Sequence, residues 1–244
     1  MTQAGGRRPR WRRIAAVAAV LLLLLALQMT VLEISRARCF SLVGEAICRV
    51  ETEAPVVALT FDDGPTPSGV ALARQVLREN DARGTFFLIG SEVAGREDLV
   101  RQLVADGHEI GNHSYSHPRM IFRWPGSYDE EIGRADTVLR RAGAPALTLF
   151  RPPYGKKLIG LPNALARHNY RMIMWDVEDP PGAADPRAYA AEIVRQARPG
   201  SIILMHVMYA PNAVAREALP LVVRGLRARG FRLVTVSELL ATEG

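Results

Sequence analysis

The 244-residue chain contains only two cysteines, Cys39 and Cys48, and both lie in the stretch CFSLVGEAIC. So few thiols exclude a disulfide-rich scaffold and a zinc site built from a cysteine cluster. Folded as a hairpin about Val43 and Gly44, the stretch places the two cysteines opposite each other, which predicts a disulfide in an oxidising compartment. Two unpaired small core residues are the alternative.

The sequence also lacks an excess of basic residues beyond position 38. Residues 1–38 hold seven arginines and one acid, Glu33, and these account for the whole formal net charge of +6, because the remainder has 24 basic and 24 acidic residues. A basic groove that binds nucleic acid is therefore not expected.

The N-terminus is typical of a membrane segment. Residues 1–13 are rich in arginine, and residues 14–32 form a nearly continuous apolar run that is about 28 Å long as a helix, close to one hydrocarbon thickness. The arginines place the N-terminus in the cytoplasm, so the rest of the chain is expected on the extracytoplasmic side. A cleaved signal peptide is the alternative, but no small-x-small cleavage site follows, and we favour a single-pass anchor.

Residues 33–50 are expected to link the anchor, through the possible disulfide hairpin, to one domain over residues 51–244. Within that domain, short apolar runs alternate with amphipathic helical stretches. The predicted strands are 56–61, 84–89, 108–111, 147–151, 171–175, 201–206 and 231–236. The predicted helices are 68–80, 97–106, 128–142, 162–168, 186–197 and 213–229, with a capping box of Ser127 and Glu130 on the third. This alternation predicts an α/β fold with a parallel sheet, open or closed into a barrel.

Polar residues collect at the carboxyl ends of the predicted strands, which is the edge where α/β folds build reaction chemistry. They are Asp62 and Asp63, His113 and His117, Arg151, Asp176 and His206.

His113 and His117 are four residues apart, so one helical turn would bring them to one face, where they could chelate a divalent ion. The spacing alone is weak evidence for a metal site, because such a pair of histidines is more often structural or merely exposed. Together with an aspartate from a neighbouring strand end, it becomes an Asp-His-His set with open coordination positions. The second aspartate, held by a cation such as Arg151, would then remain free as a base.

Five ordered motifs, TFDDGP, HSYSH, RPPYG, WDV and LMH, resemble those of the polysaccharide deacetylases of carbohydrate esterase family 4, over nearly all of residues 55–240. The resemblance implies a distorted (β/α) barrel, often of seven strands. It implies hydrolytic removal of acetyl groups from N-acetylated amino sugars of peptidoglycan, chitooligosaccharides or an exopolysaccharide.

The resemblance also implies roles for individual residues. Asp63, His113 and His117 would bind zinc or another divalent metal, for which cobalt, nickel, manganese and iron are alternatives. Asp62 would be the general base, positioned by Arg151. The backbone N–H of Tyr154 would hold the oxyanion, and His206 would be the general acid.

The sequence departs from the family pattern after WDV, where it reads EDPPG. The carboxylate that supports His206, through a basic residue such as Arg83, is therefore open among Asp176, Glu178 and Asp179. Trp124 and Tyr209 are candidates for stacking on sugar rings.

Other functions fit the residues less well. A non-haem iron oxygenase would be expected to have an HxD pair and an all-β pattern. A tethered carbohydrate-binding protein without activity, or a deacylase of a small N-acyl compound, remains an alternative. The sequence gives no indication of the oligomeric state.

Overall fold

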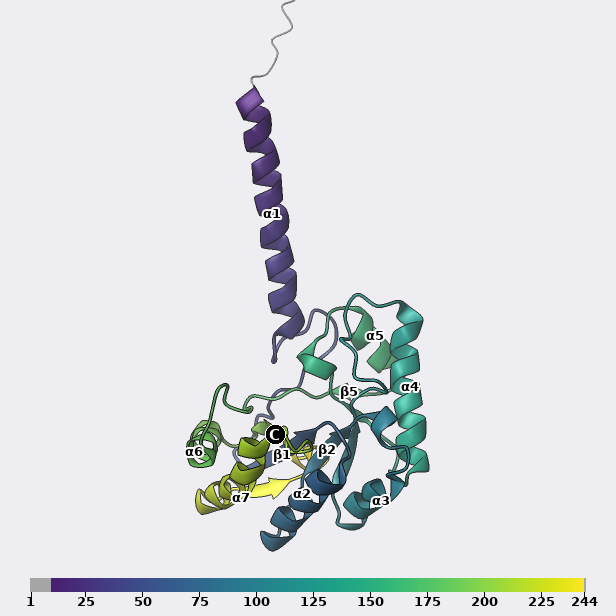
Figure 1. Cartoon of the computed structure of the whole chain (residues 1–244), viewed down its shortest axis with the longest axis vertical. Coiled ribbons are helices and arrows are strands. Elements are labelled where there is room, and N and C mark those ends of the chain that lie inside the picture. Colours follow the sequence, from purple (N-terminus) through teal and green to yellow (C-terminus); the bar gives the residue numbers. More distant parts are fainter. Residues whose placement is uncertain (1–9, 244) are drawn as a thin grey trace, which may run out of the picture.

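The computed structural model describes residues 10–243, in which a long N-terminal helix projects from an α/β domain (Figure 1). Seven parallel strands form one sheet in the order β5-β4-β3-β2-β1-β6, and β7 pairs with β1. They are β1 (Val56–Asp62), β2 (Thr85–Leu88), β3 (Glu109–Asn112), β4 (Leu149–Phe150), β5 (Arg171–Met172), β6 (Ile202–Met205) and β7 (Arg232–Val234). The prediction of seven parallel strands is confirmed.

The sheet curls into a barrel that is not fully closed. Among the described residues, the gap between β5 and β6 is crossed by isolated bridges, Ile47 to Ile173 and Val177 to Ile203, in place of a continuous ladder. The fold is therefore a distorted barrel of the kind that the motifs imply.

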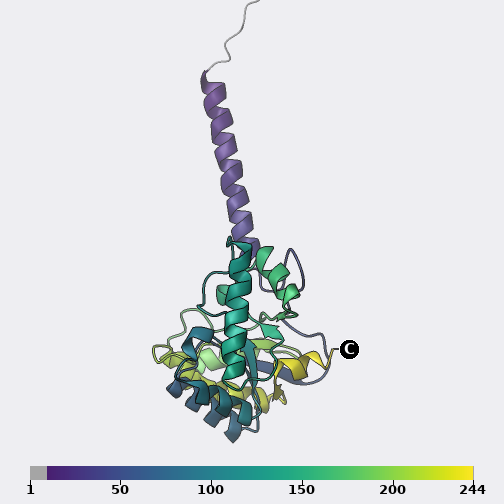
Figure 2. The same cartoon turned by 90° about the vertical axis from the view of Figure 1, so that its right-hand side faces the viewer.

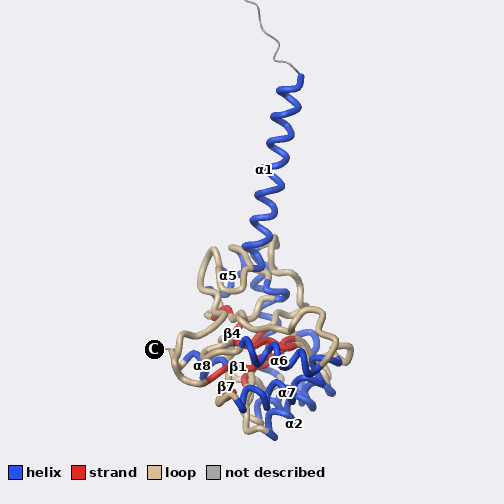
Figure 3. The backbone as a smooth tube through the Cα atoms, turned by 90° about the vertical axis from the view of Figure 1, so that its left-hand side faces the viewer, coloured by secondary structure: helices blue, strands red, loops and turns tan. Residues whose placement is uncertain are grey.

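The helices follow the strands in alternation, and α2, α6 and α7 lie together along one side of the sheet (Figure 3). They are α2 (Pro67–Glu79), α3 (Glu97–Ala105), α4 (Pro125–Arg141), α5 (Gly160–Arg167), α6 (Pro186–Gln196), α7 (Ala213–Ala228) and α8 (Val236–Leu240). Two short 3-10 turns, η1 (Gly90–Glu92) and η2 (Pro153–Gly155), were not predicted, and neither was α8.

The predicted capping box of Ser127 and Glu130 is wrong. Helix α4 begins three residues earlier than expected, at Pro125, because a proline fits the first helical position. The Ser127 hydroxyl donates to the carbonyl of Trp124 at 2.7 Å, and Glu130 pairs with Arg134 one turn further along.

Strand β1 is buried along its whole length, as expected for a parallel strand that is covered on both faces. Its side chains alternate between two apolar clusters: Val57 and Leu59 pack toward the helices, whereas Val56 and Ala58 pack inside the curl of the sheet. By the same alternation Thr60 and Asp62 point inside the curl. The strand thereby delivers a carboxylate to the interior of the barrel at its carboxyl end.

Helix α1 (Arg10–Arg36) stands clear of the domain (Figure 2). The stretch from Trp11 to Arg36 contains an 18-residue window with a mean hydropathy of 2.6, and it is long and apolar enough to cross a membrane. Residues 1–9, which form most of the basic segment that we expect in the cytoplasm, lie outside the described residues.

The segment after α1 packs against the domain and contains a disulfide between Cys39 and Cys48, whose Cα atoms are 5.1 Å apart. The hairpin that was expected here is not formed, because Ile47 pairs with Ile173 and Arg49 with Ser201 across the open side of the barrel. Ile47 and Val50 are buried in the core. The packed domain therefore begins a few residues before position 51.

Candidate active site

The curled sheet brings the predicted polar residues together at one edge. Asp62 is the last residue of β1, and His113, Arg151 and His206 directly follow β3, β4 and β6. Because the strands are parallel, these positions converge on one mouth. Asp176 is the exception, since β5 ends at Met172 and not at 175 as predicted.

Asp63, His113 and His117 form a group whose ligand atoms all lie within 4.8 Å of one another. The two Nε2 atoms are 3.2 Å apart, and Asp63 Oδ1 is 3.5 Å from that of His117 and 3.9 Å from that of His113. His113 donates its Nδ1–H to the carbonyl oxygen of Arg151 at 2.8 Å, which leaves the Nε2 lone pair facing the group. This arrangement of a backbone bond behind a free nitrogen is typical of metal-binding histidines.

The pKa values of these groups agree with a site that holds a cation. Burial lowers the pKa of His113, and burial together with His113 lowers that of His117, so both rings are neutral and can act as ligands. Burial and the charge of Asp62 raise the pKa of Asp63, so a nearby cation would stabilise its ionised form. One carboxylate and two imidazole nitrogens fit a divalent transition metal such as zinc.

The two histidines do not share a helical turn, and that prediction is wrong. The loop that carries them is irregular, with left-handed backbone at Ser114 (φ 65°) and His117 (φ 56°). Asn112 Oδ1 accepts a bond from the Ser114 N–H at 2.9 Å, and Ser114 Oγ accepts one from the His117 N–H at 3.1 Å. Side-chain bonds to the backbone thus replace the helix in bringing the two rings together.

The same loop is held by Glu131 of α4, which the sequence reasoning missed. Its carboxylate accepts bonds from the backbone N–H groups of Tyr115 and Ser116 at 3.0 and 2.8 Å, and from the Ser116 hydroxyl at 2.6 Å. The signal was present, because Glu131 lies on the otherwise apolar stripe of α4 beside the buried Tyr128 and Ile132. An acid at such a position is rarely buried unless polar groups satisfy it.

Asp62 is buried and paired with Arg151, whose Nη1 donates to Asp62 Oδ1 at 2.7 Å. Burial alone would raise the pKa of Asp62, but the charge of Arg151, the bond from Arg151 and the charge of His206 outweigh it and keep the pKa below its ordinary value. The other carboxylate oxygen, Oδ2, lies 3.6 Å from His113 Nε2. Asp62 is therefore ionised beside the candidate metal-binding group of Asp63, His113 and His117.

Arg151 is fully buried and is fixed on all sides. It donates to Thr60 Oγ1 at 2.7 Å and to the Met174 carbonyl at 3.1 Å, and its guanidinium lies 4.1 Å from the ring centroid of Phe87. Because its guanidinium is held by these contacts, Arg151 can fix the orientation of the Asp62 carboxylate.

His206 stands on the other side of the mouth, with its Nδ1–H bonded to Asp179 Oδ2. The second oxygen of Asp179 accepts a bond from the Tyr189 hydroxyl of α6. Burial opposes the charged form of the imidazole, but the bond to Asp179 and the nearby charge of Asp62 raise the pKa of His206 to about 9. The ring therefore carries a proton at neutral pH.

Of the carboxylates that remained open, Asp179 supports His206, and Asp176 and Glu178 do not. Asp176 accepts bonds from Ser201 Oγ and the Ile202 N–H, whereas Glu178 accepts a bond from the Trp175 ring at 2.7 Å. The expectation that Asp176 or Glu178 holds the imidazole is not met, because both are engaged elsewhere.

Arg83 does not take part in the site either. It precedes β2, at the amino ends of the strands, where its guanidinium pairs with Glu238 of α8 at 2.6 Å. There it lines a cavity of about 480 Å³ with His108 and Arg232. The barrel separates this position from the mouth that holds His206.

Tyr154 lies in η2 with left-handed backbone (φ 58°), after two consecutive prolines that restrict the turn. Its ring is exposed and lies 4.7 Å, centroid to centroid, from that of His117. Tyr154 therefore lies at the edge of the site, next to His117 of the candidate metal-binding group.

The two candidates for sugar stacking differ in position. Tyr209 bonds through its hydroxyl to Glu92, and burial, this bond and the nearby charge of Asp63 raise its pKa, so it stands beside the mouth. Trp124 precedes α4 and is 86% exposed.

Comparisons with known proteins agree with this geometry. Residues 49–173 match the polysaccharide deacetylase family. A chitooligosaccharide deacetylase of Azorhizobium caulinodans is 35% identical over 213 residues, which cover 79% of this chain and 98% of that protein. A peptidoglycan-N-acetylglucosamine deacetylase of Bacillus cereus is 31% identical over 200 residues, covering 81% of this chain and 93% of that protein.

Solved structures of the same kind superpose on the domain. The Bc1960 peptidoglycan N-acetylglucosamine deacetylase matches with a TM-score of 0.75 and 28% identity, covering 80% of this chain and 92% of that one. A family 4 carbohydrate esterase of Streptomyces lividans, in complex with acetate, matches with a TM-score of 0.67 and 33% identity, covering 75% and 93%. Together with the family match over half of the sequence, these similarities show that the chain belongs to the polysaccharide deacetylases of carbohydrate esterase family 4.

Proposed function

We propose that the protein is a metal-dependent hydrolase that removes acetyl groups from N-acetylated amino sugars of a glycan. The observation that carries the proposal is the position of Asp62, which is ionised and paired with Arg151 directly beside the Asp63, His113 and His117 group. A base and a metal site that share one wall can act on the same water molecule.

Asp63, His113 and His117 would hold the metal, and zinc suits this mixture of nitrogen and oxygen ligands, with cobalt, nickel, manganese and iron as alternatives. When bound there, the metal supplies a Lewis acid that polarises the acetyl carbonyl and lowers the pKa of water.

The chain's own residues divide the proton transfers between them. Asp62 takes a proton from the attacking water, and its low pKa keeps it ready as a base near neutral pH. As the water oxygen bonds to the acetyl carbon, the Tyr154 N–H donates to the carbonyl oxygen that becomes negatively charged. His206, protonated at neutral pH, gives its proton to the sugar nitrogen while the C–N bond breaks, which leaves acetate and a free amino sugar.

We further propose that α1 anchors the enzyme in the cytoplasmic membrane, with the N-terminus inside and the catalytic domain outside. The apolar, exposed length of α1 and the arginines before it support this topology. The Cys39–Cys48 disulfide agrees with an oxidising compartment.

The test is acetate release by the purified full chain from N-acetylglucosamine oligomers and from peptidoglycan, after chelation and with or without added zinc. We expect release that disappears on chelation and returns with the metal, and the better substrate identifies the glycan class. If metal binds but no acetate is released from either substrate, the assignment to these glycans is wrong. The tethered binding protein, or an enzyme for small N-acyl compounds, would then replace it.

A further inference from the structure

The large apolar side chains that the domain exposes are confined to three neighbouring segments. Among the described residues after α1, they are Phe40, Leu42, Phe122, Trp124, Tyr154 and Ile159. The segments are the disulfide loop that follows α1, the loop before α4, and the stretch between β4 and α5. Scattered apolar residues are normal on a protein surface, but a gathering of them marks an interaction site.

Direct contacts join these segments to one another. Arg119 of the loop before α4 stacks over the ring of Tyr154, with 5.1 Å between the guanidinium carbon and the ring centroid. The Tyr128 hydroxyl accepts a bond from the Arg123 N–H at 3.2 Å, and a Cβ added to Gly160 would meet the Tyr128 ring at 2.6 Å. The loop before α4 and the loop before α5 therefore form one continuous surface, which we call the anchor-side face.

The same surface receives the end of α1. The Lys157 N–H donates to the Ser35 carbonyl at 2.9 Å, and the buried Lys157 ammonium donates to the Ala37 carbonyl. Phe40 lines a groove with Glu33 and Arg36 of the last turn of the helix. The C-terminal end of α1 and the exposed apolar side chains of the domain are thus neighbours.

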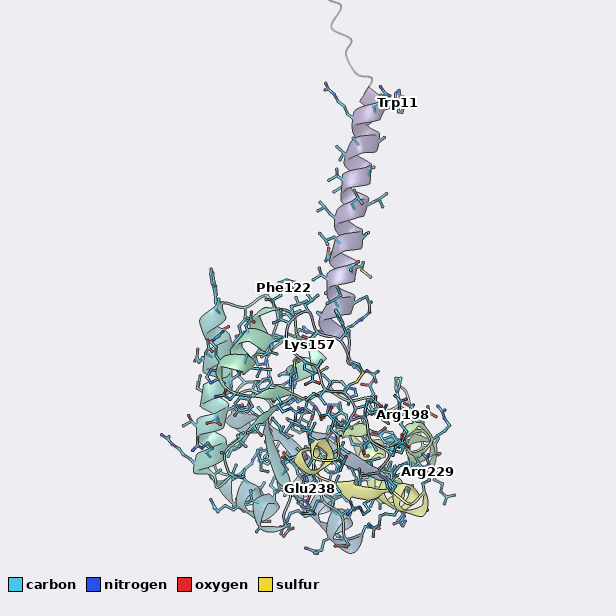
Figure 4. The ribbon with its side chains drawn as sticks, turned by 180° about the vertical axis from the view of Figure 1, so that it is seen from behind. Trp11, Phe122, Lys157, Arg198, Arg229 and Glu238 are labelled. Carbon is cyan, nitrogen blue, oxygen red and sulfur yellow. A yellow bond between two sulfur atoms is a disulfide. The ribbon has the colours of Figure 1, made fainter. Side chains whose placement is uncertain are left out.

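Along the axis of α1, the anchor-side face lies at the level where the apolar run of the helix ends. The run ends at Leu32, and Glu33 is the first charged residue after it. Phe122 lies at the end of the domain that α1 leaves, level with the last turns of the helix, whereas Glu238 and Arg229 lie toward the opposite end (Figure 4). A bilayer that ends near Leu32 would therefore meet Phe122 and Trp124 at its surface.

The chemistry of the face fits a membrane interface. Aromatic rings are favoured at the headgroup level, and basic side chains beside them attract anionic lipids. Phe122 is 76% and Trp124 86% exposed. Arg119 stacks over the ring of Tyr154, and Arg123 and Lys156 lie within two residues of exposed rings in the sequence.

We propose that the anchor-side face rests in the interface of the bilayer that α1 crosses, so that the rim of the catalytic site at Tyr154 opens at the membrane surface. The inference depends on the proposed anchoring role of α1. It does not depend on which glycan the enzyme deacetylates.

The experiment uses the full chain in vesicles of phosphatidylcholine and phosphatidylglycerol, with an environment-sensitive fluorophore on one introduced cysteine. The probe position is Phe122→Cys, and the matched control is Ala71→Cys, an exposed position on α2. Helix α2 lies at the end of the domain away from α1 (Figure 1). A third variant, Val17→Cys, reports on α1 itself. Quenching by phosphatidylcholine brominated on its acyl chains is measured for each, and acetate release from free oligomers is recorded on the same samples.

We expect strong quenching at Val17 and at Phe122, and none at Ala71. Quenching at Val17 without quenching at Phe122 would overturn the docked face and leave the anchor intact. No quenching at Val17 would overturn the anchor and the docked face with it. Acetate release tests the proposed deacetylase activity independently of membrane docking, because hydrolysis of a free oligomer does not require a bilayer.

Discussion

The imidazole of His206 donates its Nδ1–H to Asp179, whose other oxygen accepts a bond from Tyr189. The bond to Asp179, together with the charges of Asp62, Asp179 and Asp63, raises the pKa of His206 to about 9 against the opposing effect of burial. The imidazolium is therefore the dominant form at neutral pH, and it persists until the pH rises through that value.

Replacing Asp179 should shift the alkaline limb of the pH–rate profile. In Asp179→Asn, His206 loses its charged partner, so its pKa falls and the protonated acid is lost at a lower pH. We expect kcat at pH 8 to fall by roughly tenfold or more, with the limb moved toward neutral. Tyr189→Phe is the control, because it keeps the carboxylate and should move the limb less. An unchanged limb in Asp179→Asn would remove His206 as the acid.

Substituting Asp62 should separate catalysis from metal binding. Asp62→Asn keeps the shape of the side chain but cannot accept a proton, so kcat should fall by about 10²- to 10⁴-fold. Metal content, measured by atomic absorption, should stay near that of the unaltered protein. The matched variant Asp63→Asn should lose metal as well as activity, and the reverse pattern would exchange the two roles.

Removing His113 should abolish both metal content and activity, because its Nε2 is one of three donors that lie within 4.8 Å of one another. His168→Gln is a suitable control, since that ring pairs with Asp129 away from the site. Equal metal loss in the two variants would mean that the metal binds elsewhere.

Glu131 should influence metal affinity without touching the metal group. In Glu131→Gln, the bonds to the loop of Tyr115 and Ser116 are weakened, so His117 is held less firmly. The expected loss of zinc affinity is about 10- to 100-fold by competition with a chelator, the usual effect of groups that orient metal ligands. Glu130→Gln, at the neighbouring exposed position, should leave the affinity unchanged.

Arg151 should be important for stability as well as for activity. Arg151→Met leaves the buried Asp62 without its partner, which typically costs about 3–5 kcal/mol of unfolding free energy. Arg167→Met removes an exposed pair with Asp129 and should cost about 1 kcal/mol or less. The comparison is made by thermal unfolding of both proteins in one detergent. A similar loss in both variants would contradict the structural role of Arg151.

The strand pattern could be predicted from the sequence because β1, β2, β4 and β6 are buried and consist mainly of apolar residues. The start of α6 at Pro186 follows from local chemistry, because Asp185 caps the helix and proline fits its first position. The loop from His113 to His117 could not be predicted in the same way. Its shape depends on Asn112, Ser114 and the distant Glu131, and the four-residue spacing suggested a helical turn instead.

The partner of His206 was similarly difficult to predict. Asp176, Glu178 and Asp179 follow Trp175 within four positions, and only the path of the loop decides which one faces the imidazole. Arg83 was misplaced even though it directly precedes the predicted strand 84–89, and a residue before a parallel strand lies at the amino ends of the barrel, opposite the mouth that holds His206. The disulfide could be foreseen from two nearby thiols, whereas the pairing of Ile47 and Arg49 across the open side of the barrel could not.

The hydrogen bonds from Lys157 to the end of α1 restrict how far the domain can move from the helix. A flexible linker would let the domain move freely around its anchor, but here the helix is bound to the loop that carries Tyr154. If α1 crosses a bilayer as proposed, the enzyme would meet its substrate by lateral diffusion within a thin layer at the membrane surface. Its turnover would then depend on the amount of glycan per unit area of membrane, and glycan further from the membrane would not be reached.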